Sequence, residues 1–576
     1  MRFYDKIKVP PPTFCPECRL QRRLAFRNEK QLYRRKCDLT GKEIISVHVA
    51  SAPFKVYEAK EWFSDRWDPM AYGFEYDFSK LFFEQFYKLM LVVPRISLMI
   101  DYPTLVNSDY TNLVGHLKNC YLISEADFDE NCAYASSIKY SKDSFDILMG
   151  QNLELCYECV NCRKCHTTYF SEDCEDCIEV AFSKNLIGCS NCVGCTNLRK
   201  KQYHIFNQPY TKDEYLKRIQ ELELDSYRGV IKLREETPYL RLKFPQKYMH
   251  ERHNTKVVGD YIYYSKNSFG CNEVVGVEDS KYCQIISVKP TRDCFDYTEW
   301  GNNAALLYEC LTVGEGANNV KFSNLCWPNV RDIEYSILCR NSSNLFGCIG
   351  VRSKQFCIFN KQYSEKDYHA LREKIINHMN ETPYKDKAGR IYRYGEFFPI
   401  ELSPFMYNET NAQDFFPLTR DKALEQGFSW KDPEQRNYEV TLYAKDLPDH
   451  IKDVNDTVLS EIIGCLHNQT CNEQCTQAFR IIPQELDFLR KMNLSLPRLC
   501  PNCRHYQRIK RRNPLKLWHR KCQCAGKGSS NGVYTNTAEH LHHSENEHCP
   551  NEFETTYAPE RPEIVYCEEC YLREVV

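Results

Sequence analysis

The C-terminal quarter of the chain carries cysteines in short hooks, a residue type and spacing that binds metal ions. Cys-x2-Cys and Cys-x3-Cys segments let two thiolates reach one ion from a tight turn. Two such hooks close a tetrahedral zinc site with Zn–S bonds of about 2.3 Å. The simplest arrangement is two sites in chain order: Cys471, Cys475, Cys500 and Cys503, then Cys522 (or Cys524), Cys549, Cys567 and Cys570. A second arrangement, which pairs Cys500 and Cys503 with Cys522 and Cys524, is equally compatible with the spacing.

A basic run with interleaved aromatic residues follows the Cys500/Cys503 hook. Eight Lys or Arg and no acid lie between Arg504 and Lys521, and a similar run lies between Arg19 and Lys36. Zinc knuckles with such side chains grip phosphates and stack bases. The alternative is a helical face that contacts the chain itself or another protein. The predicted nucleic-acid contacts are Arg504, Arg508, Lys510, Arg511, Arg512, Arg520, Arg19, Arg22, Arg23 and Arg27.

The first forty residues repeat the late module without a gap. A shift of 485 residues places Cys15, Cys18 and Cys37 on Cys500, Cys503 and Cys522. The early copy has glutamates at positions 58 and 61, where the late copy has Cys567 and Cys570. With His48 the three remaining cysteines would make a Cys3His site. The alternative is a metal-free remnant held by its aromatic residues.

Between these modules, small residues recur at intervals of twelve. Cys120, Cys132, Ser144 and Cys156 follow this period, and β-prone segments lie between them. A short fixed period of this kind predicts a β-solenoid, in which each rung stacks on the next. The sequence segment 201–219 is repeated 153 residues later, so the central part of the chain is also duplicated. Thr211 and Glu214 predict a capping box that opens a helix after the first solenoid.

The first solenoid has a dense set of cysteines with three interpretations. The thiols could pack as small apolar groups inside a narrow coil, hold zinc between rungs, or bind an iron–sulfur cluster. The iron–sulfur spacing lacks its usual Cys-Pro, and the second solenoid has no Cys-x2-Cys, which favours packing. The residues are Cys156, Cys159, Cys162, Cys165, Cys174, Cys177, Cys189, Cys192 and Cys195.

The composition narrows the class of protein. The chain has 576 residues, 32 cysteines and a net charge of −2, so attraction to nucleic acid has to be local. The N-terminus lacks an apolar signal region, which predicts a reducing, cytoplasmic location. The longest apolar run, from Leu89 to Ile100, is broken by Pro94 and Arg95, so no membrane association is expected. No common catalytic motif is present, and a non-enzymatic protein is expected.

Three sequence segments indicate a family resemblance: residues 10–19, residues 394–399 and residues 556–562. On these the chain resembles a family of cysteine-rich zinc-ribbon proteins of small-genome bacteria, to which no activity is assigned. The resemblance runs nearly end to end and implies zinc and this architecture. In the family pattern the first module usually has a complete cysteine set, and here it does not.

The predicted fold is mainly β with α+β elements: tandem β-solenoid-like repeats flanked by zinc-ribbon or treble-clef-like modules. The predicted order is a degenerate zinc-ribbon-like module (1–68), a helical linker (69–106), solenoid one (107–208), a helix and extended arm (209–255), solenoid two (256–360), a helix and Pro/aromatic arm (361–460) and a double zinc-ribbon-like module (461–576). The predicted function is a non-enzymatic protein that holds about two Zn²⁺ ions and contacts nucleic acid, with RNA favoured. The alternatives are a scaffold for protein partners and an iron–sulfur redox protein.

Overall fold

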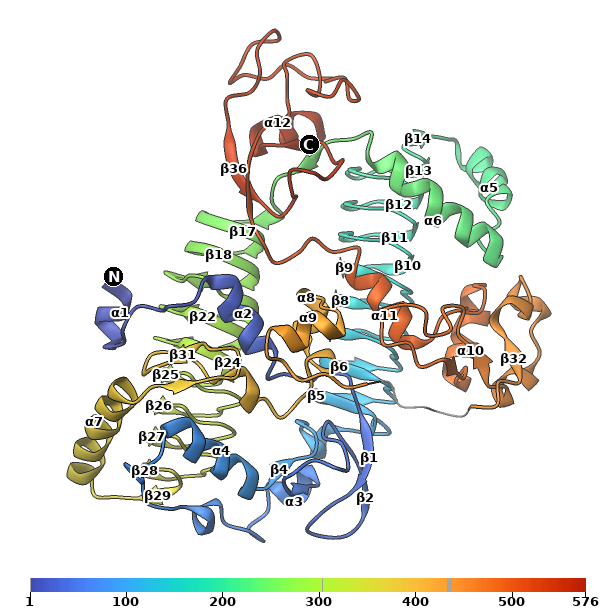
Figure 1. Cartoon of the computed structure of the whole chain (residues 1–576). Helices are drawn as coiled ribbons and strands as arrows, with labels where there is room; N and C mark the ends of the chain where they lie inside the picture. The colour runs from blue at the N-terminus through green and yellow to red at the C-terminus, as the bar shows by residue number, and fades with distance from the viewer. Residues whose placement is uncertain (1, 303, 433–437, 576) are drawn as a thin grey trace.

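Two stacks of short parallel strands, here called ladder one and ladder two, form the body of the molecule (Figure 1). The computed structural model describes residues 2–302, 304–432 and 438–575. The chain is mostly β with helices at the ends and between the ladders, as predicted. The predicted arm at 361–460 includes residues 433–437, which lie outside the described residues. Among the helices that are described, each is too short or too polar to cross a bilayer.

Ladder one consists of two five-stranded sheets, in which each strand pairs with the next and the parallel pairs share a constant offset. Ser136 lies opposite Leu148, and Leu148 lies opposite Val160, so the parallel register advances by twelve residues. The last pair is antiparallel and ends the ladder. The strands are β5 (Thr111–Lys118), β6 (Ile123–Glu130), β7 (Ser136–Lys139), β8 (Leu148–Gln151), β9 (Val160–Arg163), β10 (His166–Tyr169), β11 (Ile178–Ala181), β12 (Ser190–Val193), β13 (Gln202–Ile205) and β14 (Gln208–Pro209).

A three-residue period inside each twelve-residue rung explains the sequence of ladder one. From Asn119 to Phe206 every third residue has a positive φ, a conformation that Asn, Asp and Gly adopt most readily. From Cys120 to Cys195 every residue that follows such a position is buried. These inward positions hold Cys, Ser, Thr, Gly or an apolar residue, with Asp129 as the acidic member. The Cys-x2-Cys spacing in this ladder therefore follows from the backbone period.

Ladder two is built on the same plan with small irregularities. Arg331 lies opposite Ser343, and Ser343 lies opposite Gln355, but Asn318 lies opposite Arg331 at an offset of thirteen. The strands are β16 (Glu251–Arg252), β17 (Thr255–Tyr263), β18 (Lys266–Val275), β19 (Val277–Glu278), β20 (Gln284–Val288), β21 (Thr291–Arg292), β22 (Phe295–Gly301), β23 (Ala304–Ala305), β24 (Tyr308–Gly314), β25 (Asn318–Lys321), β26 (Arg331–Glu334), β27 (Ser343–Phe346), β28 (Gln355–Ile358) and β29 (Lys361–Gln362).

Helices follow each ladder. The predicted capping box of Thr211 and Glu214 is confirmed at the start of α5 (Lys212–Glu221), and Ser364 caps α7 (Glu365–Glu381). The predicted extended arm after α5 is wrong in part, because residues 227–241 form a second helix, α6 (Tyr227–Arg241), that continues through Pro238. Ser226 caps that helix and its apolar residues pack on ladder one, which outweighs the proline. The helical linker contains α4 (Phe82–Val92).

The two end modules share their order of elements, which bears out the duplication. In each, a first helix is followed by a helix that begins directly after Cys15 or Cys500, here called the knuckle helix. Two antiparallel strands, a short strand and a last helix come next. The early set is α1 (Arg2–Ile7), α2 (Pro16–Leu24), β1 (Tyr33–Lys36), β2 (Glu43–Ser46), β3 (Val56–Tyr57) and α3 (Ala59–Trp62). The late set is α10 (Pro483–Met492), α11 (Pro501–Ile509), β35 (Trp518–Lys521), β36 (Glu552–Thr555), β37 (Val565–Tyr566) and α12 (Glu568–Val575).

Short elements tie these modules and the arm to the body. β3 pairs in parallel with β4 (Arg95–Ile96), and β37 pairs in parallel with β15 (Gln246–Lys247). The arm and the start of the late module contain β30 (Tyr384–Lys385), β31 (Ile391–Tyr392), α8 (Asn411–Phe415), α9 (Arg420–Glu425), β32 (Leu442–Tyr443), β33 (Ile463–Gly464) and β34 (Ala478–Phe479). In Figure 1 the blue helix α2 lies over ladder two, and the red-orange helix α11 lies over ladder one.

Candidate metal centres

The first cysteine cluster, here called cluster A, gathers at the N-terminus of α11. The sulfur atoms of Cys465, Cys475, Cys500 and Cys503 all lie within 4.8 Å of one another. The Cys465 and Cys503 sulfurs are 3.9 Å apart. Four Zn–S bonds of 2.3 Å in a tetrahedron require sulfur atoms about 3.8 Å apart. The donor set therefore fits a tetrahedral zinc ion.

Cluster A differs from the predicted set at one position, because Cys465 stands where Cys471 was expected. The Cys500 amide donates to the Cys465 sulfur at 3.2 Å, which holds Cys465 against the knuckle. Cys471 lies at the rim, with its sulfur 3.7 Å from that of Cys503 and beside His467 and Glu473. Cys465 follows β33 at the end of a paired strand, so the backbone fixes its position better than that of Cys471.

The second cluster, here called cluster B, contains Cys522, Cys549, Cys567 and Cys570, all buried. Their sulfurs lie within 4.8 Å of one another, and those of Cys549 and Cys567 are 3.7 Å apart. Cys522 and Cys567 directly follow β35 and β37, Cys549 precedes β36, and Cys570 lies in α12. The Cys567 amide donates to the Cys522 sulfur at 3.2 Å, a bond that favours a thiolate. The predicted members are thus brought together, and Cys524 belongs to a neighbouring group.

In each cluster, hydrogen bonds between the thiols lower the pKa of one cysteine, which favours the metal-binding thiolate there, and raise the pKa of others, such as Cys503 and Cys570. Hydrogen bonds from the Cys465, Cys475 and Cys503 thiols lower the pKa of Cys500. Hydrogen bonds from Cys522 and Cys570 lower the pKa of Cys567 in the same way. A set of four protein ligands fills the coordination of zinc, which is the pattern of structural sites.

The early module arranges its remaining predicted ligands differently. Cys15 and Cys18 are exposed at the start of α2, whereas Cys37 is buried and accepts the Glu58 amide at 3.3 Å. The His48 ring stacks on Phe405 with ring centres 5.2 Å apart and meets Phe54 edge-on. Burial, with a smaller effect of Arg95, lowers the pKa of His48 well below its usual value. His48 therefore serves this module as an aromatic packing residue.

The cysteines of ladder one point their thiols at backbone carbonyls. The Cys159 sulfur lies 3.2 Å from the Thr168 carbonyl oxygen and 3.6 Å from that of Tyr157. Similar pairs of carbonyl contacts surround Cys156, Cys162 and Cys165. Burial raises the pKa of Cys120 to about 12, whereas hydrogen bonds from the Cys162 and Cys177 thiols lower the pKa of Cys165 to about 6. These contacts favour the packing interpretation over metal.

In the early module, the predicted nucleic-acid residues of α2 are buried against ladder two. Arg19 Nη2 lies 2.8 Å from Asp296 Oδ2. The guanidinium groups of Arg22 and Arg23 lie 2.6 and 2.8 Å from the Glu309 carboxylate oxygens. Arg27, further along, pairs with Glu299 and Glu29 and donates to Thr312.

The late knuckle repeats this pattern on ladder one. Arg504 Nη1 and Arg508 Nη1 each lie 2.6 Å from an oxygen of Asp146, and Arg504 also pairs with Glu485 at 2.7 Å. All four side chains are buried. The other predicted residues also have partners within the chain. Arg511 donates to the Glu158 carbonyl, Arg512 pairs with Glu273, Lys510 pairs with Glu473, and Arg520 donates to Gln523.

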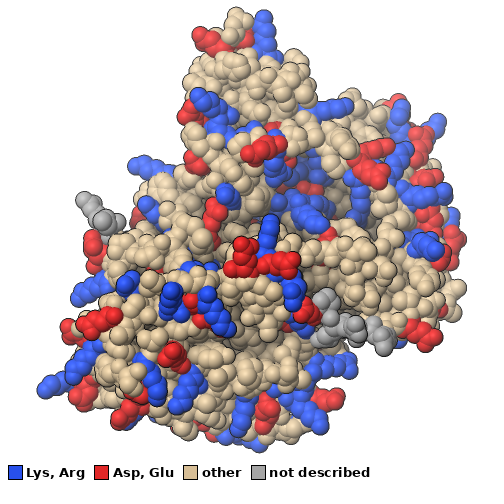
Figure 2. All heavy atoms as spheres, in the orientation of Figure 1, with Lys and Arg blue, Asp and Glu red and all other residues tan. Residues whose placement is uncertain are grey.

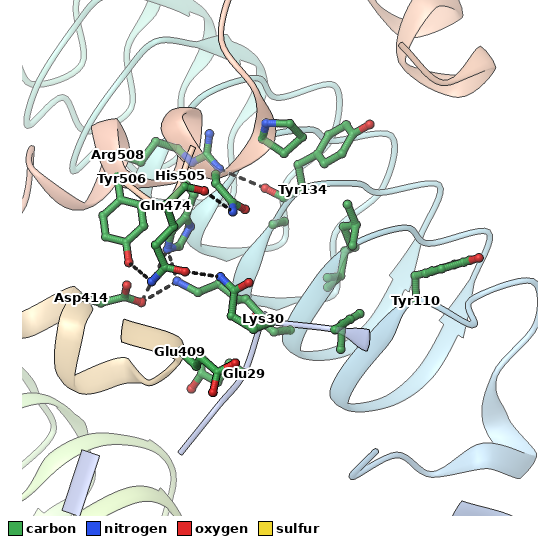
Figure 3. A pocket seen from close by; sticks show the side chains of 18 of the residues that line it. Glu29, Lys30, Tyr110, Tyr134, Glu409, Asp414, Gln474, His505, Tyr506 and Arg508 are labelled. Atoms are coloured by element: carbon green, nitrogen blue, oxygen red, sulfur yellow. Dashed lines mark hydrogen bonds and ion pairs between the residues drawn. The ribbon is translucent and has the colours of Figure 1, made fainter. Parts of the chain in front are cut away.

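The aromatic residues of this run also face inward. Figure 3 shows His505 and Tyr506 directed toward Lys30, Asp414 and Gln474 in a pocket of about 70 Å³. Lys30 Nζ lies 2.5 Å from Asp414 and also contacts His505 Nε2. Gln474 Nε2 donates to the Tyr506 hydroxyl at 3.1 Å. Residues from the early module, the arm and the late module therefore interlock here. On the face in Figure 2, basic and acidic side chains are interspersed.

No family model and no curated protein matches the chain. Among solved structures, it is similar to a putative acetyltransferase from Desulfovibrio desulfuricans G20 at 10% identity. The match covers 51% of this chain and 87% of the other, with a TM-score of 0.11.

Proposed function

We propose that this chain is a non-enzymatic zinc-binding scaffold: two β-solenoids, braced by zinc-ribbon-like ends, that present their faces to protein partners. One observation carries the proposal. The knuckle arginines, whose charge first suggested nucleic acid, are buried in ion pairs with ladder carboxylates. These arginines are not free to bind a phosphate. An arginine that turned toward a phosphate would leave its buried carboxylate partner unpaired, which is costly.

Zinc is the ion that fits clusters A and B best. Soft thiolate donors in a tetrahedral set select zinc or iron–sulfur clusters over calcium and magnesium. Both clusters combine N–H···S hydrogen bonds with sulfur spacings near the zinc tetrahedron. In this role the ions stabilise small modules and are not catalysts.

The solenoid description is supported by the register and by the three-residue period. A constant parallel offset with one inward side chain per three residues fits a narrow coil of four short sides. In such a coil the inside holds small or apolar residues, and the outside can carry rows of aligned side chains.

One outward row on ladder one has the properties of a partner surface. His116, Phe128 and Tyr140 stack at twelve-residue intervals, with ring centres 4.2 and 5.1 Å apart. Phe128 and Tyr140 are about half exposed. Near this row is a cavity of about 540 Å³ between the two ladders, lined by aromatic and acidic residues that include Trp300 and Trp327. Exposed aromatic rows of this kind are typical of protein interaction sites.

Photo-cross-linking tests the scaffold proposal directly. A photoreactive amino acid at Phe128 or Tyr140 is expected to capture a discrete protein in cells, and nuclease treatment is not expected to change the product. The matched control is Tyr239 on α6, which is 73% exposed and away from this row. Equal labelling at all three positions would contradict the proposal.

Nucleic acid stays the second candidate function, because three lysines of the late module remain exposed. Lys516 and Lys521 pair with exposed glutamates, and exposed pairs of this kind contribute little, whereas the exposed Lys510 pairs with the buried Glu473. Such lysines can exchange their partners for phosphates. Fluorescence anisotropy with single-stranded RNA distinguishes the candidates. Binding that weakens with salt and is lost on reversing all three lysines to Glu would favour nucleic acid.

A further inference from the structure

A second group of ligand atoms lies against cluster B. Cys524, His540, His543 and Cys570 each offer one atom, and these atoms lie within 4.8 Å of one another. His540 Nδ1 is 3.2 Å from both the Cys524 sulfur and His543 Nε2, and His543 Nε2 is 3.4 Å from the Cys570 sulfur. A tetrahedral zinc ion with two nitrogen and two sulfur ligands requires about 3.3 Å between nitrogens and about 3.6 Å between nitrogen and sulfur.

The hydrogen bonds around His540 fix which of its ring nitrogens carries the proton. Nε2 lies 2.9 Å from Glu574 Oε1, and both side chains are at most 2% exposed. Glu574 accepts four further bonds, from the Tyr534 hydroxyl, from the Thr537 amide and hydroxyl and from the Ala538 amide, so it acts as an acceptor. Nε2 therefore donates to it, and Nδ1 presents its lone pair to Cys524. A carboxylate behind a histidine is the usual support of a metal ligand.

His543 is oriented in the same way. Its Nδ1 lies 3.1 Å from the Ser544 carbonyl oxygen, which can only accept, so Nδ1 carries the proton and Nε2 the lone pair. The lone pairs of His540 Nδ1 and His543 Nε2 then face each other at 3.2 Å. Two unprotonated nitrogens at this distance repel each other unless a cation lies between them and the two sulfurs.

We propose that Cys524, His540, His543 and Cys570 bind a further Zn²⁺ ion, so that Cys570 bridges two ions in a binuclear centre. The inference rests on the proposed zinc-binding role of cluster B. The second zinc ion also brings the net charge of the site closer to zero. One zinc ion with four thiolates has a net charge of −2, whereas two zinc ions with five thiolates and two neutral histidines have −1, which is less costly to bury.

The zinc count by native mass spectrometry tests the proposal on the full chain. The wild type is expected to hold three zinc ions: one in cluster A and two in the binuclear centre. His540→Ala and Cys524→Ser are each expected to hold two. The comparison variant is His542→Ala in the same loop, because the His542 ring nitrogen lies 3.2 Å from the Cys549 sulfur and 3.4 Å from that of Cys570, and with His543 it forms an alternative group of ligand atoms. This variant is expected to keep three ions.

Cadmium NMR tests the bridge itself. With ¹¹³Cd in place of zinc, the two ions of the centre are expected to give two resonances with mutual coupling through the Cys570 sulfur. His540→Ala should remove one resonance and the coupling.

Two ions in the wild type and also in His540→Ala would overturn the binuclear centre while clusters A and B remain. Loss of an ion in His542→Ala but not in His540→Ala would also overturn it. No zinc in the wild type would instead contradict the proposed function as a whole.

Discussion

The two ends of the chain dock crosswise through equivalent arginines. Arg19 and Arg23 of the early knuckle hold Asp296 of ladder two, and Arg504 and Arg508 of the late knuckle hold Asp146 of ladder one. Each pair of arginines occupies the same positions of its knuckle helix. The late end has two complete cysteine clusters, whereas the early end has lost most of their counterparts.

The two end modules therefore dock on the ladders in the same way, but their interiors are stabilised differently. The early module keeps the same backbone features without the full ligand set, including an amide donated to the Cys37 sulfur by Glu58, as Cys567 donates to Cys522. Its interior belongs to a large apolar core that includes Trp62, Phe83 and Phe86. The core around cluster B is small and consists largely of cysteines. If the late module binds zinc as proposed, the same small fold is supported by buried aromatic residues at one end and by metal ions at the other.

Metal removal is expected to have the largest effect and to separate the two ends. A strong chelator should unfold the late module and leave the early one intact, because zinc supplies on the order of 10 kcal/mol to small metal-dependent folds. Hydrogen exchange measured by peptide should show loss of protection in β35, β36 and β37, with β1, β2 and β3 unchanged. Equal loss at both ends would contradict the difference drawn here.

Breaking either docking carboxylate is expected to have a large and similar effect at both ends. Asp146→Asn and Asp296→Asn should each destabilise the adjacent knuckle helix by about 3–5 kcal/mol, because buried guanidinium groups lose their charged partner. Local hydrogen exchange in α11 and α2 measures this. Asp127→Asn, on the partly exposed pair with His116, is the control and should cost less than about 1 kcal/mol. A large effect at only one end would show that the dockings are not equivalent.

Asp129 is expected to make the stability of ladder one fall as the pH rises from acidic to neutral. It occupies an inward position, and burial raises its pKa from 3.8 to about 7. Between these values the folded state holds a proton that the unfolded state releases, so stability should fall as the pH rises from about 4 to 7. Asp129→Asn should remove this fall, which is on the order of 4 kcal/mol over the whole range. Urea unfolding of both proteins at pH 5 and pH 8 measures it, and a parallel pH profile would contradict it.

Substitution of a ladder cysteine is expected to have the smallest effect. Cys159→Ser should cost about 1 kcal/mol, because serine already fills equivalent inward positions, where Ser171 donates to the Tyr169 carbonyl. The zinc count should not change, whereas Cys500→Ser in cluster A should lose one ion. A lower zinc count for Cys159→Ser would place metal inside ladder one.

Much of the architecture followed from repetition in the sequence. The twelve-residue period, the two duplications and the capping box of Thr211 all have direct counterparts in the structure. The members of cluster B could be grouped because their hooks lie on one repeated module. Helix α6 was missed because Thr237 and Pro238 resemble the start of an extended arm.

The remaining features depend on long-range placement. Cys465 is an isolated cysteine 35 residues before Cys500, so spacing favoured Cys471 in the nearby hook. The partners of the arginines could not be predicted, because Asp146 and Asp296 lie hundreds of residues from the knuckles they hold. The Cys-x2-Cys segments of ladder one resemble metal hooks only because each side of its rungs has three residues.

The zinc count of three variants tests the central claim most directly, namely that ions support the late module and packing supports the early one. Native mass spectrometry would compare the wild type with Cys500→Ser, Cys567→Ser and the double variant Cys15→Ser with Cys18→Ser. The account predicts fewer zinc ions in the first two variants and the full wild-type number in the double variant. Loss of an ion from the double variant, or a wild type without zinc, would contradict it.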